Sequence, residues 1–103
     1  MSVVTNLIFC EIDTDCDAVK NIEPIENINE FLKNHYSRLT RVDDIDGPKG
    51  IEARIWLAAA SYFFFEDLRK LGVLIKKQKW ESPDCVQLFI KWDGDNKFRE
   101  CQL

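Results

Sequence analysis

The feature that most constrains the fold of this sequence is an apolar run from Ile55 to Phe65, IWLAAASYFFF, in which Ser61 is the only polar residue. At 11 residues the run is too short for a membrane-spanning helix, which needs about 20. Pro48 lies just before this region and Gly72 just after it, where a helix commonly begins and ends. The pattern therefore predicts one long helix over about residues 49–71.

This predicted helix is apolar around its whole circumference, whereas a helix that covers one face of a sheet needs only an apolar stripe. The stripe expected to face the sheet consists of Ala53, Leu57, Ala60, Phe64, Leu68 and Leu71. Ile55 and Tyr62 lie opposite, with Trp56 and Phe65 beside them. Either the first helix and residues 73–80 cover these side chains or another chain does. Because exposed aromatic patches mark interfaces, we predict a homodimer or partner contact through Ile55, Trp56, Tyr62 and Phe65.

The other segments predict an α+β fold with a single domain over residues 1–103. Two-residue alternation predicts strands near 3–12 and 86–92, and a turn after Trp92 joins the second of these to a last strand near 97–102. Helical spacing from Ile25 to Tyr36 predicts a helix near 24–36, followed by a short strand near 38–42. Residues 73–80 fit either a short helix or an extended connector. We expect a two-layer sandwich of β-α-β-α-β-β order, with about four strands and two to three helices on one face.

Acidic side chains outnumber basic ones, 18 to 14, which gives a net charge of −4. Nucleic acids and anionic membranes both select clustered Lys and Arg, so we expect neither as a partner. The acids gather after two predicted strands, in the groups Asp13, Asp15, Asp17 and Asp43, Asp44, Asp46. If these strands run parallel, both groups begin at one edge of the sheet, where α/β folds commonly bind ligands.

Three interpretations of the acidic groups stay open. Alternating carboxylates suit Mg²⁺ or Ca²⁺, and Asp13 and Asp15 superficially resemble the D-x-D motif of the haloacid dehalogenase-like phosphatases, whose other motifs are not found here. An acidic surface also suits a basic protein partner, as in small inhibitors, antidotes and immunity proteins. The third interpretation is that these loops are polar because they are solvated.

The remaining chemistry-bearing residues give weaker signals. Cys10, Cys16, Cys85 and Cys101 contain no C-x-x-C pair, so we expect free thiols that pack as small hydrophobic side chains, and no metal or cofactor. His35, the only histidine, lies near the end of a predicted helix, where it complements the helix dipole. With no basic stretch before an apolar segment, we expect no signal peptide and a cytoplasmic location.

These observations predict a small acidic, non-enzymatic interaction module of the inhibitor, immunity or antidote type. It would bind a protein partner through the acidic rim and the aromatic face of the long helix. A homodimer through the same helix face stays open beside a contact with a different partner. The alternative is a small-ligand or metal-dependent phosphoryl-processing domain that uses Asp13, Asp15 and Asp44.

Overall fold

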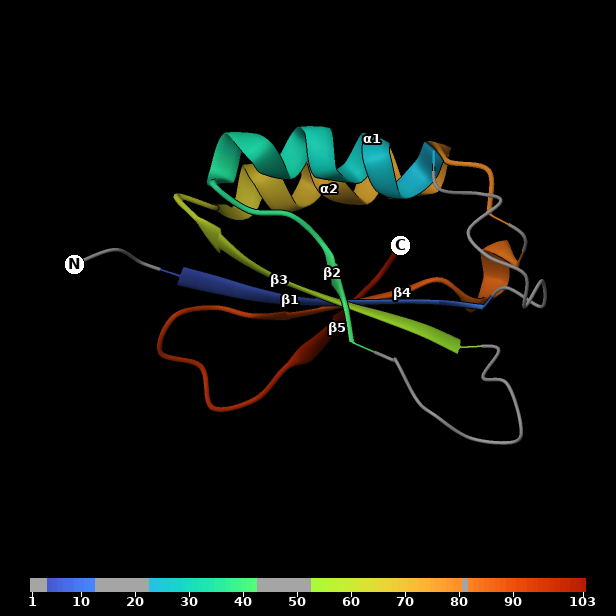
Figure 1. The fold of residues 1–103 in the computed structure, drawn as a ribbon. Helices are drawn as coiled ribbons and strands as arrows, with labels where there is room; N and C mark the ends of the chain where they lie inside the picture. Colours follow the sequence, from blue (N-terminus) through green and yellow to red (C-terminus); the bar gives the residue numbers. More distant parts are fainter. Residues whose placement is uncertain (1–3, 13–22, 43–52, 81) are drawn as a thin grey trace.

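The computed structural model describes residues 4–12, 23–42, 53–80 and 82–103. Its strands are β1 (Val4–Ile12), β2 (Thr40–Arg41), β3 (Ala53–Ser61), β4 (Gln87–Lys91) and β5 (Arg99–Cys101). Its helices are α1 (Glu23–Leu32) and α2 (Phe65–Lys77), with 3₁₀ turns η1 (Lys33–His35) and η2 (Pro83–Cys85). The strands form one antiparallel sheet of order β2-β3-β1-β4-β5, and both helices lie on the same face of it (Figure 1). The predicted α+β class is confirmed.

The order of the elements differs from the predicted one, because residues 53–61 form a strand and not the first half of a long helix. The chain runs β-α-β-β-α-β-β, which is the split β-α-β arrangement with one strand added at the C-terminal edge. The sheet has five described strands where about four were expected, and two α-helices pack on it.

Strand β3 lies between β1 and β2 and pairs with both, so its apolar residues are divided between two faces. Trp56, Ala58 and Ala60 point toward the helices and are buried, whereas Ile55 and Leu57 point away from them. Leu57, predicted to lie on the stripe of the long helix that faces the sheet, is instead on the sheet face away from the helices. A continuous apolar run fits a central strand as well as a buried helix, since periodicity alone does not separate the two.

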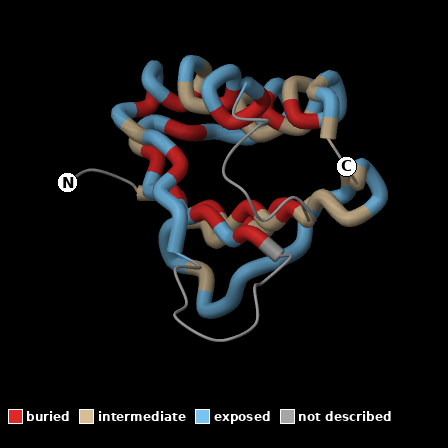
Figure 2. Tube along the Cα trace, turned by 45° about the vertical axis from the view of Figure 1, so that its right-hand side comes forward, coloured by how far each residue is buried: buried red, intermediate tan, exposed pale blue. Residues whose placement is uncertain are grey.

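The core lies between the sheet and the helices, where Figure 2 shows the buried segments facing one another. From the sheet it contains Leu7 and Phe9 of β1 and Leu88 and Ile90 of β4, all nearly inaccessible to solvent. The helices contribute Ile25, Ile28 and Leu32 of α1 and Leu71 and Ile75 of α2, at the three- and four-residue spacing of one helical face.

Helix α2 begins at Phe65, and Gly72, predicted to end a helix, lies in its interior. The Asp67 carboxylate accepts a hydrogen bond of 2.8 Å from the Phe64 N–H and so caps the first turn. Glu66 and Asp67 at its start, and Lys76 and Lys77 at its end, complement the helix dipole. Residues 73–77 are therefore helical, whereas their sequence fitted either a helix or an extended connector.

Replacing Gly72 with alanine is expected to raise the free energy of unfolding by about 0.5–1 kcal/mol, because glycine in a helix interior costs about that much conformational entropy. A Cβ added here would meet Leu103 Cδ2 at 3.7 Å, an ordinary contact. Urea denaturation measures the difference. The matched control is Gly94→Ala, which is expected to destabilise because Gly94 has φ +89°. A Gly72→Ala variant less stable than wild type would contradict the expectation.

Candidate functional site

Four exposed aromatic side chains lie at one end of the sheet, three of them in two connections and the fourth, Phe65, at the start of α2. Tyr36 follows η1, while Tyr62, Phe64 and Phe65 lie where β3 leads into α2. Their exposed fractions are 79%, 63%, 62% and 68%. We call these four residues the aromatic end. Tyr62 and Phe65 were predicted as interface residues, whereas Tyr36 and Phe64 were assigned to faces that contact the core.

The backbone holds the two tyrosines of the aromatic end in an uncommon conformation. Tyr36 has φ 57° and Tyr62 has φ 53°, the left-handed region that bulky residues rarely adopt. Tyr36 occupies the position where a helix usually ends with glycine, and its N–H donates to the Lys33 carbonyl at 3.2 Å. The two rings meet edge to face with centroids 6.2 Å apart. Such backbone strain, of order 1–3 kcal/mol per residue, clusters at functional sites.

His35 links the connection after η1 to the connection between β3 and α2. Its Nδ1 lies 3.2 Å from the Ser61 carbonyl oxygen and 3.1 Å from that of Tyr62, so the Nδ1–H donates to this turn. Its Nε2 lies 3.5 Å from Asp67 Oδ1. The imidazole packs against Phe63 edge to face, with centroids 5.2 Å apart. His35 is therefore buried and positions the aromatic end rather than facing solvent as a general base.

The other predicted interface residues lie elsewhere. Ile55 is on the sheet face away from the helices, and Trp56 is 9% exposed in the core between the layers. The single face on which we expected Ile55, Trp56, Tyr62 and Phe65 does not form, because alternate residues of a strand point to opposite sides. Trp56 would reach a partner only if the helices moved away from the sheet.

The six predicted acidic residues, Asp13, Asp15, Asp17, Asp43, Asp44 and Asp46, lie outside the described residues. The strands that precede them are described, and both are antiparallel to β3, so β1 and β2 run in the same direction without being neighbours. Ile12 and Arg41 therefore end at one edge of the sheet. The aromatic end follows Ser61, which pairs with Val4 at the opposite end of β1. The nine residues of β1 separate the two ends by roughly 26 Å.

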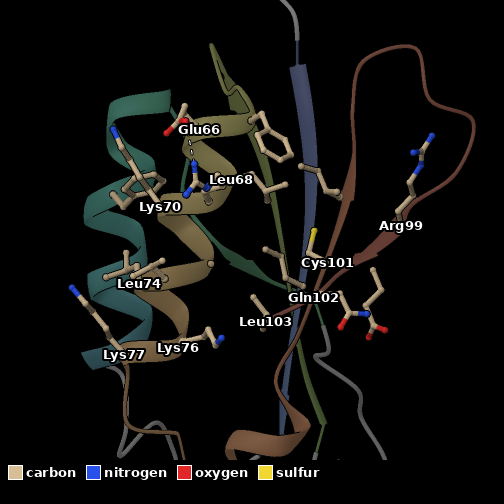
Figure 3. A pocket seen from close by; sticks show the side chains of 18 residues that line it. Glu66, Leu68, Lys70, Leu74, Lys76, Lys77, Arg99, Cys101, Gln102 and Leu103 are labelled. Carbon is tan, nitrogen blue, oxygen red and sulfur yellow. Dashed lines mark hydrogen bonds and ion pairs between the residues drawn. The ribbon is translucent and has the colours of Figure 1, made fainter.

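A groove of about 950 Å³ lies between α2 and the added strand β5 (Figure 3). Leu68, Leu88, Ile90, Cys101 and Leu103 give it an apolar lining. Lys70 and Lys77 extend from the side of α2 away from Cys101 and Leu103 (Figure 3). Among its acidic and basic lining residues, Glu66 and Arg69 pair with each other at 3.4 Å. The groove therefore combines an apolar lining with charged and polar side chains, which also include Lys76, Arg99, Glu100 and Gln102.

The thiols of the described cysteines are free, as predicted: Cys10, Cys85 and Cys101. Burial raises the pKa of the Cys10 and Cys101 thiols, and at Cys101 the Glu100 carboxylate raises it further. Both groups therefore favour the unreactive thiol form at neutral pH. Cys85 lies in η2 and not in a strand as expected.

Within the described ranges, no group of three or more His, Cys, Asp or Glu residues is arranged to hold a metal ion. The helices described there are also too short and too polar to cross a membrane. Comparison of the chain with protein-family models, with curated proteins and with solved structures finds no significant match. The site is therefore interpreted from its own geometry.

Proposed function

We propose that this protein is a non-enzymatic interaction module that binds a partner protein through the aromatic end. The observation that carries the proposal is the grouping of Tyr36, Tyr62 and Phe64, each more than three-fifths exposed, in two connections that His35 joins. Phe65 follows them in the chain at the start of α2 and is exposed as well. Tyrosine and other aromatic residues dominate the energetically important positions of protein interfaces.

The rigid support of the aromatic end favours binding. A side chain that is already ordered loses less entropy when a partner covers it, and ordering a mobile one costs about 0.5–1.5 kcal/mol. The ring contact between Tyr36 and Tyr62 supplies that order for the two tyrosines, and the Asp67 cap fixes the backbone at Phe64.

The acidic residues play a separate part in this proposal. A net charge of −4 attracts a basic partner over distances longer than a contact, which raises the association rate and excludes acidic proteins. We assign the acidic groups that contain Asp13 and Asp43 to this steering by charge and not to the contact that the aromatic end makes. This division of roles suits an inhibitor or immunity-type protein that must find its target quickly.

The test is capture of the partner from the native cell, followed by titration calorimetry with the purified pair. We expect Tyr62→Ser and Phe64→Ser each to weaken binding about thirty-fold, the effect of losing an interface position worth about 2 kcal/mol. The matched control is Val73→Ser, which removes an apolar side chain 56% exposed on α2.

Circular dichroism confirms that each variant is folded before its affinity is interpreted. Added salt is expected to slow association, because it screens the steering charges. If the folded variant with both substitutions binds within about threefold of wild type, the aromatic end is not the binding surface.

A further inference from the structure

The groove between α2 and β5 follows from the number of helices on the sheet. A helix with its side chains is about 10–12 Å wide and strands lie about 4.8 Å apart, so one helix covers about two strands. The two α-helices lie on one face of a sheet whose edge strand is β5 (Figure 1). The surface of β5 on that face therefore borders the side of α2, and the groove runs between them (Figure 3).

The walls of the groove are apolar along their middle part. Leu68 and Gly72 of α2 lie four residues apart, which places both on one side of the helix. The opposite wall contains Cys101 of β5 and Leu103 beyond it, and two buried side chains of β4 form the floor. Leu68, Cys101 and Leu103 are each half-buried, so part of each side chain is still accessible to a ligand.

Gly72 leaves space in the α2 wall between Leu68 and Lys76. A Cβ added at this position would have Leu103 Cδ2, at 3.7 Å, as its nearest described neighbour. Glycine disfavours a helix interior because it loses the most conformational entropy on folding. Helix α2 is thus intrinsically weakest at a point that borders the groove, where a larger side chain would fill it.

The arginines in the lining are already paired within the protein. Arg69 lies 3.4 Å from the Glu66 carboxylate, and Arg99 lies 3.5 Å from the Asp95 carboxylate. Glu100, the other acidic residue in the lining, accepts a hydrogen bond of 2.6 Å from the Gln87 side chain. These contacts leave the charge of the lysines to decide what the groove attracts.

One of these lysines is directed toward the groove. Lys76 lies on the same side of α2 as Leu103, whereas the adjacent Lys77 extends to the other side (Figure 3). Within the described ranges, no carboxylate pairs with Lys76. An anionic group at this end of the groove would therefore meet a cation that has no competing partner there.

The length of the groove sets the length of its ligand. Lys76 is eleven positions after Phe65, the first residue of α2 in the lining, which corresponds to about 16 Å along the helix axis. An extended hydrocarbon advances about 1.3 Å per carbon, because its C–C bonds of about 1.5 Å meet at near-tetrahedral angles. An unbranched hydrocarbon of about twelve to fourteen carbons spans this distance.

We propose that the groove binds an unbranched fatty acid, with its carboxylate at Lys76 and its hydrocarbon between α2 and β5. Small-molecule sites have volumes of about 300–1,000 Å³ and combine a mostly apolar lining with a few polar groups that fix the orientation, and this groove of about 950 Å³ has both properties. This activity goes beyond the protein contact proposed above, since Phe65 is the only residue of the aromatic end that lines the groove.

Titration calorimetry of the full chain with sodium octanoate, decanoate, dodecanoate and tetradecanoate, each below its micelle concentration, tests the length. Every added methylene is expected to tighten binding about two- to fourfold, the upper value being the effect of complete burial. The gain is expected to stop near fourteen carbons, so hexadecanoate should bind no more tightly than tetradecanoate. Equal further gains at hexadecanoate, or no binding of dodecanoate at about 1 mM, would overturn the proposal.

Lys76→Glu and Lys77→Glu are the matched pair that tests the carboxylate position, since both make the same change in net charge. Lys76→Glu is expected to weaken decanoate binding about five- to tenfold, because it replaces attraction with repulsion at an exposed site. Decyltrimethylammonium should instead bind more tightly to this variant than to wild type. Lys77→Glu is expected to change either affinity by less than about twofold. Equal effects of the two substitutions on decanoate contradict a carboxylate at Lys76.

Gly72→Leu tests the location of the hydrocarbon, because the added side chain occupies the middle of the groove. Once circular dichroism shows that it is folded, this variant is expected to bind dodecanoate at least tenfold more weakly than wild type. Cys101→Trp fills the groove from the opposite wall and replaces it if it does not fold. A folded groove-filling variant that binds as tightly as wild type overturns the proposal. So does a loss of binding in the Tyr62→Ser, Phe64→Ser variant, which would place the ligand at the aromatic end.

Discussion

Replacing Phe9 with alanine is expected to lower the free energy of unfolding by about 3–5 kcal/mol. Phe9 is 1% exposed on the central strand, where it pairs with Trp56 on one side and Leu88 on the other. Its ring also packs on Trp80, with centroids 5.2 Å apart. Strands β3 and β4 and the ring of Trp80 hold this position, so the structure is expected to close only part of the cavity that alanine leaves. Small domains are stable by about 5–15 kcal/mol, so the variant would be close to unfolding.

Thermal and urea denaturation measure this loss. Val73→Ala is the control, because truncating an exposed apolar side chain away from special features changes stability by less than about 0.5 kcal/mol. A loss below about 1 kcal/mol for Phe9→Ala would show that β1 is not the central strand of the fold.

Replacing Arg54 with leucine is expected to cost about 3–5 kcal/mol, although leucine is the more hydrophobic residue. Arg54 is 5% exposed and stands directly opposite Glu11, which is 6% exposed, in the β1–β3 register. Removing the cation leaves a buried carboxylate beside apolar side chains. The desolvation of that carboxylate is then no longer offset by an opposite charge.

The matched variant is Glu11→Leu with Arg54→Leu, which removes both charges from the same layer. It is expected to recover most of the lost stability, because a buried ion pair replaced by apolar residues is often neutral in free energy. The four proteins form a double-mutant cycle, measured by urea denaturation. Equal losses in the single Arg54 variant and in the double variant would mean that the two charges do not act together.

The sequence predicted most elements correctly, including the central strand β1, and failed at the apolar run that forms β3. The alternation of Leu88 and Ile90 with Phe89 and Lys91, and the turn after Trp92, identified β4 and its hairpin with β5. The spacing of Ile25, Ile28 and Leu32 identified α1. In β3, three consecutive alanines, which favour helices, follow Trp56 and Leu57. Only pairing with β1 and β2, which are distant in the sequence, decides that this run is a strand.

Two of the four residues of the aromatic end, Tyr62 and Phe65, were expected at the surface, but on the face of a long helix that does not form. The surplus of aromatic residues correctly indicated that Tyr62 and Phe65 lie at the surface, although no helix carries Tyr62. Tyr36 continues the apolar spacing of α1 and so was expected to face the core. The left-handed turn at Tyr36 reverses that direction, and the bonds of His35 to the neighbouring connection support the turn. Such a tertiary contact leaves no local signal in the sequence.

The edges of the described sheet limit how copies of this protein can associate. Strand β2 contributes only two residues and β5 only three, and each of these edge strands carries a charged, exposed arginine, Arg41 or Arg99. Short and charged edges discourage the strand-by-strand addition that builds fibrils. The described part of the sheet therefore offers no long, flat edge on which further strands could pair in the manner of amyloid.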